Sequence, residues 1–170
     1  MKALTIWQPW ATLCVTPRVN DPSKPAKEFE TRGWATKHRG VLAIHAAKRW
    51  TEDGMFLTRT LDYRDARTGC QPWGPNPLPF GCIVGLVDLV DCLPTSTEDG
   101  RRCHPWTERL SPAERAFGDF SFCRYGWRLA NPRPLPEPVP AVGKQGLWTL
   151  DDELLRAIAR HVRLDAEALR

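Results

Sequence analysis

The sixteen prolines of this 170-residue chain restrict its fold more than any other feature of the sequence. Proline fixes φ and removes a backbone hydrogen-bond donor, so long helices are excluded from much of the chain, while strands joined by fixed turns are permitted. Four prolines fall in 68–80, which is predicted to be a loop. Five fall in 132–142, which is predicted to be an extended arm.

The segments between the prolines predict about six strands, because they are rich in apolar and β-branched residues. The predicted strands are 2–7, 27–32 (as an extended edge), 40–47, 81–92, 125–131 and 146–150. Segment 81–92 gives the strongest signal, and Gly85 in its middle predicts a bulge or a close approach of backbones.

Short helices are predicted between the strands. Proline is favoured at the first helical position, which indicates a helix over 9–15. Ser111 and Glu114 have the spacing of a capping box. Further helices are expected over 50–62 and over 151–162, where acidic residues open an apolar stripe, whereas 16–26 is expected to be a loop.

This order of elements indicates an α+β protein, because the helical segments are too few and too short for repeated βαβ units. It favours a small closed β-barrel with short flanking helices over a doubly wound sheet. The length suits one domain.

The composition predicts a cytoplasmic protein without cofactor, metal or membrane contact. No run of about 18 apolar residues occurs, and the first ten residues lack the pattern of a signal peptide. The six cysteines form no CxxC pair, and Cys103-His104 is the one adjacent pair of possible metal ligands. The net charge of +4 and pI near 8.8 suit local phosphate contact better than wrapping along a duplex.

Five motifs, in a fixed order, carry a resemblance to ASCH domains of the bacterial and endothelial-factor branches. The motifs are Thr5–Ala11, Lys27–Arg32, Arg39–Lys48, Gly126–Leu129 and Gly143–Trp148. The resemblance implies a PUA-like barrel over 1–150, with 151–170 as a C-terminal helix packed on the same domain. It also implies a ligand cleft opposite the first helix, since relatives in the wider superfamily bind RNA or hold modified bases.

One small group of ASCH enzymes hydrolyses N(4)-acetylcytidine with a lysine, a threonine three residues later and a glutamate on a later strand. The lysine position falls on Lys27 and the threonine position on Glu30. The glutamate position falls near Gly85, where the nearest acid is Asp88. Only Lys27 therefore matches the hydrolase pattern, and Lys27 and Glu30 are the candidate catalytic residues.

The spacing of Lys27 and Glu30 limits how the two side chains can meet in one cleft. Lys27 and Glu30 lie three apart, so they point to opposite faces of a flat strand unless a turn brings them together. Glu28, Glu30 and Arg32 share one face of a regular strand. Arg32 is predicted to line the pocket, or else to form a structural ion pair with Glu30.

The first helix supplies three further candidate binding residues. Gln8 and Pro9 lie where a helix start exposes backbone N–H groups, a place that suits an anion or a carbonyl oxygen. Trp10 either stacks on a base or plugs the barrel end.

Four other candidates come from the ends of predicted strands. His45 either contacts a ligand or is a buried histidine bonded to a backbone carbonyl, and Lys48 either contacts phosphate or is solvated. Lys144 and Gln145 lie in a turn bracketed by glycines, and glutamine is a competent reader of a base edge.

We therefore predict a nucleic-acid-binding or nucleobase-binding module, with RNA, single-stranded nucleic acid or a modified nucleoside as its partner. The alternatives are a nucleoside amidohydrolase or ribonuclease, and a protein-interaction adaptor that uses 132–142. The sequence does not determine the oligomeric state.

Overall fold

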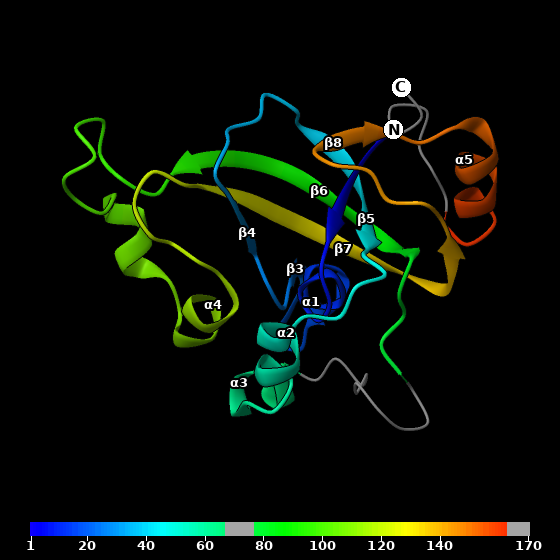
Figure 1. The fold of residues 1–170 in the computed structure, drawn as a ribbon, viewed down its shortest axis with the longest axis horizontal. Coiled ribbons are helices and arrows are strands. Elements are labelled where there is room, and N and C mark those ends of the chain that lie inside the picture. Colours follow the sequence, from blue (N-terminus) through cyan, green and yellow to red (C-terminus); the bar gives the residue numbers. More distant parts are fainter. Residues whose placement is uncertain (67–76, 163–170) are drawn as a thin grey trace.

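A computed structural model of the protein describes residues 1–66 and 77–162. Its centre is a curled six-stranded sheet with the order β4-β7-β6-β5-β1-β8 (Figure 1). The strands are β1 (Lys2–Ile6), β4 (Phe29–Arg32), β5 (Gly40–Ala46), β6 (Cys82–Pro94), β7 (Tyr125–Pro140) and β8 (Leu147–Thr149). β1 and β5 run parallel, and the other neighbours are antiparallel.

The predicted α+β class is confirmed, but the sheet is a half-barrel and not a closed barrel. β4 and β8 are its two edges. The curl brings the edge strand β4 toward the end of β1, where Arg32 Nη2 donates to Thr5 O at 3.0 Å. A side chain therefore bridges two strands that are not neighbours in the sheet.

The proline-rich segment 132–142 is extended, as predicted, but most of it is strand and not an arm. Residues 132–140 continue β7 and pair with β6, with Val139 opposite Ile83 and Arg133 opposite Leu86. β4 pairs only with residues 125–128 of β7. Beyond them the side of β7 away from β6 has no strand partner among the described residues, and a strand edge tolerates proline.

Gly85 confirms its prediction of a close approach. The β6–β7 register shifts between Ile83 and Gly85. A Cβ at Gly85 would lie 2.7 Å from Arg133 O and 2.8 Å from the Val15 side chain, so no other residue fits without movement. Helix α1 (Trp10–Val15) can therefore pack tightly against β6.

The remaining helices are short. They are α2 (Glu52–Leu57), α3 (Leu61–Asp65), the 3₁₀ helix η1 (Pro105–Arg109), α4 (Pro112–Phe117) and α5 (Asp152–Ala159). The helix predicted over 50–62 is two helices, because the first ends at Leu57 and Thr60 caps the second by accepting from Tyr63 N. Ser111 caps α4 by accepting from Glu114 N. The loop predicted over 16–26 contains a hairpin of β2 (Pro17–Arg18) and β3 (Asp21–Pro25).

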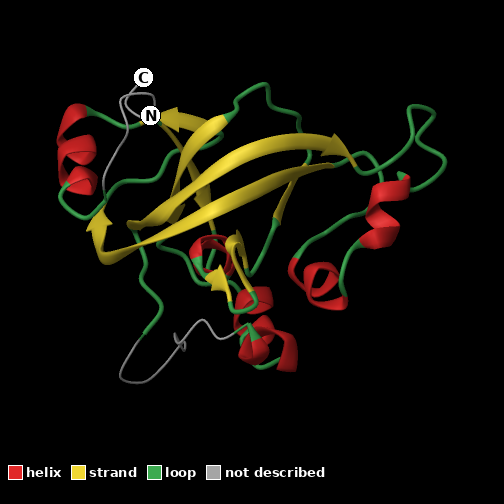
Figure 2. Cartoon of the chain, turned by 180° about the vertical axis from the view of Figure 1, so that it is seen from behind, coloured by secondary structure: helices red, strands yellow, loops and turns green. Residues whose placement is uncertain are grey.

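The core has two layers because successive residues of a strand face opposite sides of the sheet. Leu42 and Ile44 face α1, together with Trp127. Ala43 faces the other side, where Trp148 of β8 and Ile158 of α5 are buried. Helix α5 lies beside the end of β7 (Figure 2). Burial of Ile158 attaches α5 to the sheet, while 163–170 of the predicted C-terminal helix and most of the predicted loop 68–80 lie outside the described residues.

Among the described residues, no helix is both long and apolar enough to cross a membrane.

Candidate functional site

The segment before and within β4 forms a buried chain of ionised side chains. Lys27 is 1% exposed, and its Nζ donates to Phe29 O and, at 2.9 Å, to Glu30 Oε2. Glu30 Oε1 lies 3.0 Å from Arg32 Nε. Lys27 precedes the first residue of β4, so a change of direction there places the two predicted catalytic side chains in contact.

Mutual pairing determines the ionisation of Lys27 and Glu30. Burial by itself lowers the pKa of Lys27, but the charge of Glu30, its hydrogen bond and the charges of other neighbours together outweigh burial and leave this pKa raised. Burial by itself raises the pKa of Glu30, but Lys27 and Arg32 outweigh it and leave this pKa lowered. In this geometry Lys27 is an ammonium group and Glu30 a carboxylate, and both are occupied by each other.

Arg32 is the accessible end of this chain, with 27% of its side chain exposed. Its guanidinium is held at two nitrogens, because Nη2 donates to Thr5 O and Nε forms an ion pair with Glu30 without hydrogen-bond geometry. Nη1 has no partner among the described residues. A planar guanidinium fixed in this way is suited to binding a phosphate or a base edge.

Thr5 connects Arg32 to the glycine-bracketed turn. The Thr5 hydroxyl donates to Lys144 O at 2.9 Å and accepts from Trp148 Nε1 at 3.2 Å. Lys144 and Gln145 are exposed. Lys144 Nζ lies 5.8 Å from the centroid of the Trp148 ring, a cation–π contact. The turn is thus anchored beside Arg32 with its polar side chains outward.

His45 adopts the buried alternative. It is 2% exposed, and its Nε2 lies 3.1 Å from Ala141 O, so Nε2 carries the proton in this contact. Burial lowers the pKa of His45, the Ala141 hydrogen bond opposes this, and the charge of Lys48 lowers it further. A Cβ at Gly143 would lie 2.6 Å from Nδ1, so the backbone of the turn covers this ring. His45 supports the turn as a neutral side chain.

Gln8 is also a structural residue. It is completely buried, its Oε1 accepts from both Thr12 N and Thr12 Oγ1, and its Nε2 donates to Pro79 O at 2.7 Å. Its side chain therefore occupies the start of α1, which was expected to be open to a ligand. Pro9 is buried as well, and Trp10 is half-buried between two parts of the core.

Two further accessible side chains, Lys48 and Trp7, lie near the ends of β5 and β1. Lys48 is exposed, as one alternative anticipated. Trp7 is 52% exposed, and the sequence reasoning missed it because attention went to the helix that follows. Strand alternation places Trp7 on the same face as Thr5, which was a usable signal.

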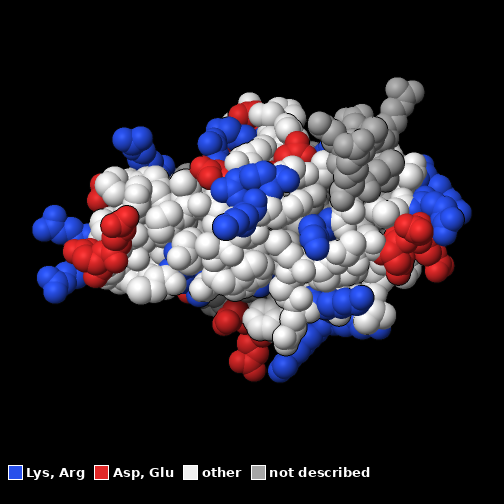
Figure 3. Space-filling view, turned by 90° about the horizontal axis from the view of Figure 1, so that it is seen from above, with Lys and Arg blue, Asp and Glu red and all other residues white. Residues whose placement is uncertain are grey.

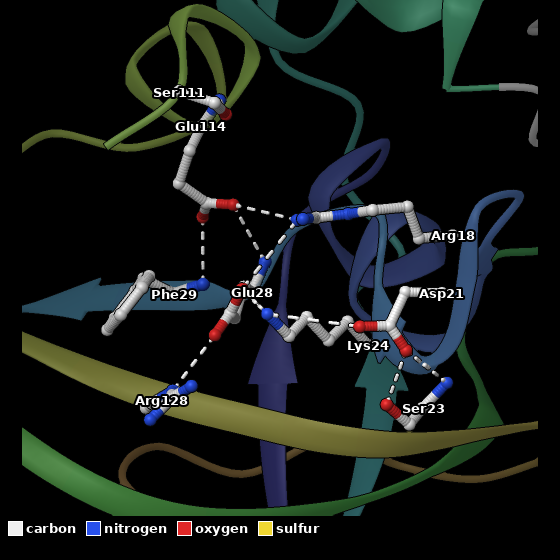
Figure 4. A network of polar contacts seen from close by, with 9 residues as sticks. All are labelled: Arg18, Asp21, Ser23, Lys24, Glu28, Phe29, Ser111, Glu114 and Arg128. Carbon is white, nitrogen blue, oxygen red and sulfur yellow. Dashed lines mark hydrogen bonds and ion pairs between the residues drawn. The ribbon is translucent and has the colours of Figure 1, made fainter. Parts of the chain in front are cut away.

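Glu28 leaves the face that it was predicted to share with Glu30 and Arg32. Its carboxylate lies 2.9 Å from Arg128 Nε on β7, on the other side of the segment (Figure 4). The reason is that Glu28 precedes β4 and is not in regular strand geometry. Asp88 also stays apart from the Lys27 chain, because it pairs with Arg133 and with Asn131.

A third buried carboxylate, Glu114, was predicted only as the second residue of a capping box, and its carboxylate has other partners. Glu114 of α4 accepts from Glu28 N at 2.9 Å and from Phe29 N at 2.8 Å (Figure 4). The carboxylate therefore accepts hydrogen bonds at the edge of β4 that a neighbouring strand would otherwise accept. Burial raises the pKa of Glu114, while the charge of Lys27 and these two N–H groups oppose the rise.

Two surface hollows lie to either side of this arrangement. One, of about 480 Å³, is lined by residues that include Arg18, Ala26 and Phe117. The other, of about 730 Å³, is lined by residues that include Gly33 and Arg124. Neither is lined by Arg32 or Lys144, so the predicted residues meet at a surface beside these hollows.

Comparison with known proteins identifies relatives that are similar to most of this chain. No family model matches the chain. Activating signal cointegrator 1 of Homo sapiens and of Mus musculus are each 30% identical to it over 151 residues, which is 89% of this chain and 22% of theirs. The chain therefore spans about a fifth of the length of these curated relatives.

A crystal structure of a ZmASCH mutant protein from Zymomonas mobilis is also similar, with a TM-score of 0.48 and 13% identity, covering 94% of this chain and 96% of that one. The assignment to particular branches stays a prediction. The similarity to the two cointegrators extends over 151 residues of this chain, and it supports the predicted ASCH-domain assignment.

Proposed function

We propose that this ASCH domain binds nucleic acid, RNA foremost, and holds a phosphate or a base edge against Arg32. The observation that carries the proposal is the fixed guanidinium, paired at Nε and Nη2 and without a described partner at Nη1. Arginine in such a pre-organised fork loses little rotamer freedom when it binds an oxygen acceptor.

The exposed neighbours of Arg32 have the matching chemistry. Lys48 and Lys144 form no ion pair with any described residue, so both ammonium groups are available to phosphate. Gln145 offers an amide donor and acceptor to a base edge. On the face shown in Figure 3, basic side chains form several small groups, and acidic side chains lie between them. This distribution supports local contact with a few nucleotides in preference to a continuous duplex track.

Lys27 and Glu30 act as positioning residues in this proposal. Their buried pairing fixes Glu30, and Glu30 fixes Arg32. Hydrolysis by Lys27 requires an uncharged, accessible amine, whereas this amine is enclosed and its pKa is raised. The cytoplasmic location stays a prediction within the same proposal.

The test is a titration of the wild-type chain with a single-stranded RNA, a single-stranded DNA and a duplex of equal length, at two salt concentrations. Fluorescence anisotropy is expected to show single-stranded binding that weakens only modestly with salt, since few phosphates are contacted. Dissociation constants weaker than about 1 mM for every nucleic acid at low salt would contradict the proposal.

Incubation with N(4)-acetylcytidine, followed by chromatography, tests the positioning role. No cytidine is expected. If the wild-type chain releases cytidine and Lys27→Ala does not, Lys27 is a catalytic residue and the assigned role is wrong.

A further inference from the structure

Exposed aromatic and basic side chains, with the half-buried Trp50, gather where β1 and β5 end. We call this set the aromatic–basic surface and define it as Trp7, Lys48, Arg49, Trp50 and Phe80. We propose that it binds the flanking nucleotides of a single strand by stacking and phosphate contact. This inference rests on the proposed function, because one nucleotide of the same strand contacts Arg32.

Backbone pairing places the two halves of this surface together. β1 and β5 are parallel with Ile6 opposite Ala46, and Ala47 N donates to Ile6 O at 2.9 Å. The chain therefore leaves both strands at the same end of the sheet, with Trp7 directly after β1 and Lys48 two residues after β5. Trp7 lies two residues beyond Thr5, whose carbonyl oxygen accepts from Arg32.

Phe80 belongs to the same surface through Gln8. The Gln8 amide donates to Pro79 O, so the residue before Phe80 is bonded to the residue after Trp7. Phe80 is 38% exposed and meets Trp50 edge-on, with ring centroids 5.3 Å apart and an interplanar angle of 79°. A rigid aromatic pair of this kind offers a stacking platform at small entropic cost.

Gly81 lets Lys48 lie across the surface. Its φ is +66°, and a Cβ there would lie 2.7 Å from Lys48 Cγ. The lysine stem thus packs on the backbone beside Phe80. Neither Lys48 nor Arg49 forms an ion pair within the described part of the chain, so their charge is unbalanced locally. Glu52 and Asp53 at the start of α2 are the acidic boundary of this surface.

Aromatic rings interleaved with lysine and arginine are the arrangement by which proteins bind single strands without sequence preference. Every base has a stackable face, and the cations follow the phosphates. A duplex keeps its bases stacked internally and cannot place them on Trp7 or Phe80. The preferred ligand class is therefore a single strand of several nucleotides, sequence-tolerant over this surface.

The experiment compares a nucleoside monophosphate with an eight-nucleotide single-stranded RNA, by ligand-observed NMR and anisotropy respectively. Trp7→Ala is expected to weaken octamer binding about tenfold and to leave monophosphate binding unchanged. Trp7→Phe retains most of the octamer affinity because it keeps a stacking face. Phe122→Ala is the matched control, since Phe122 is 49% exposed on the segment between α4 and β7, and it should change neither affinity.

The outcomes separate this inference from the proposed function. If the wild-type chain binds the monophosphate but Trp7→Ala binds the octamer as well as wild type does, the surface assignment is overturned and the proposed function stands. If the wild-type chain binds neither ligand, the proposed function fails and the surface assignment fails with it. Unchanged thermal unfolding of Trp7→Ala shows that the loss reflects binding, because the exposed ring is not part of the core.

Discussion

Two polar clusters flank the same short segment, residues 27–32, and they differ in burial. The inner cluster consists of Lys27, Glu30 and Arg32, on the side facing β1. The outer cluster consists of Glu28 with Arg18 and Arg128, joined by Glu114 (Figure 4). Both contain carboxylates paired with basic groups, so residue type does not distinguish them.

Burial assigns different roles to the two clusters. In the inner one, Lys27 and Glu30 are both removed from solvent, so their pairing is obligatory and determines the position of Arg32. In the outer one, Arg18 and Arg128 are substantially exposed, and water screens their ion pairs. Glu28 and Glu114 are both buried, and Glu114 is the member expected to matter strongly, because it accepts hydrogen bonds from Glu28 N and Phe29 N.

The largest effect is expected from breaking the inner pair. Glu30→Ala leaves a buried ammonium without its partner and should reduce the free energy of unfolding by about 3–5 kcal/mol. Urea denaturation measures this. The double variant Lys27→Met with Glu30→Leu removes both charges and should recover most of the loss. A single variant within about 1 kcal/mol of wild type would show that the buried pair is dispensable.

The next effect concerns the outer cluster. Glu114→Ala leaves the N–H groups of Glu28 and Phe29 without their acceptor and should cost about 1–3 kcal/mol. Chemical denaturation of Glu114→Ala and Glu114→Gln, which keeps one acceptor oxygen, should rank the glutamine variant between alanine and wild type. Equal stability of the three proteins would show that the hydrogen bonds accepted by Glu114 do not stabilise the fold.

A pH effect near neutrality is expected from His45, the buried histidine beneath the glycine-bracketed turn. Because the folded-state pKa of His45 lies below its ordinary value of 6.5, the unfolded chain binds more protons in that range. Stability is complete above the unfolded pKa and falls as pH decreases from about 7.5 toward about 5.5. Denaturation over a pH series should show this slope in wild type and a flatter one in His45→Gln. An identical slope in both proteins would exclude His45 as its origin.

The smallest effect is expected from the exposed ion pair of the outer cluster. Arg128→Ala should change the free energy of unfolding by less than about 1 kcal/mol, because the guanidinium is half exposed and screened. Thermal unfolding at low and high salt checks this. A loss as large as that of Glu30→Ala would erase the distinction between the clusters.

The strands and capped helices were predictable because their signals are local. Alternation along 40–47, the glycine within 81–92 and the Ser111 cap each depend on a few neighbouring residues. The strand over 132–140 was missed because proline content argues against a strand unless one side of it lacks a partner, which only the sheet order reveals.

The candidate site was predictable in part. The Lys27–Arg32 segment carries the inner cluster, as expected. The sequence could not show that Gln8 and His45 are buried, because the groups that satisfy them, Pro79 O and Ala141 O, are distant in the chain. The role of Glu114 was hidden for the same reason, since its acceptor function depends on the packing of α4 against β4.

The central claim is that the fixed guanidinium of Arg32 binds the nucleic acid, and Arg32→Lys tests it most directly. Lysine keeps the charge but cannot contact Glu30, Thr5 and a ligand at once. The anisotropy titration should show single-stranded RNA affinity reduced at least about tenfold, with thermal unfolding close to that of wild type. A lysine variant that binds RNA as tightly as wild type would contradict the account.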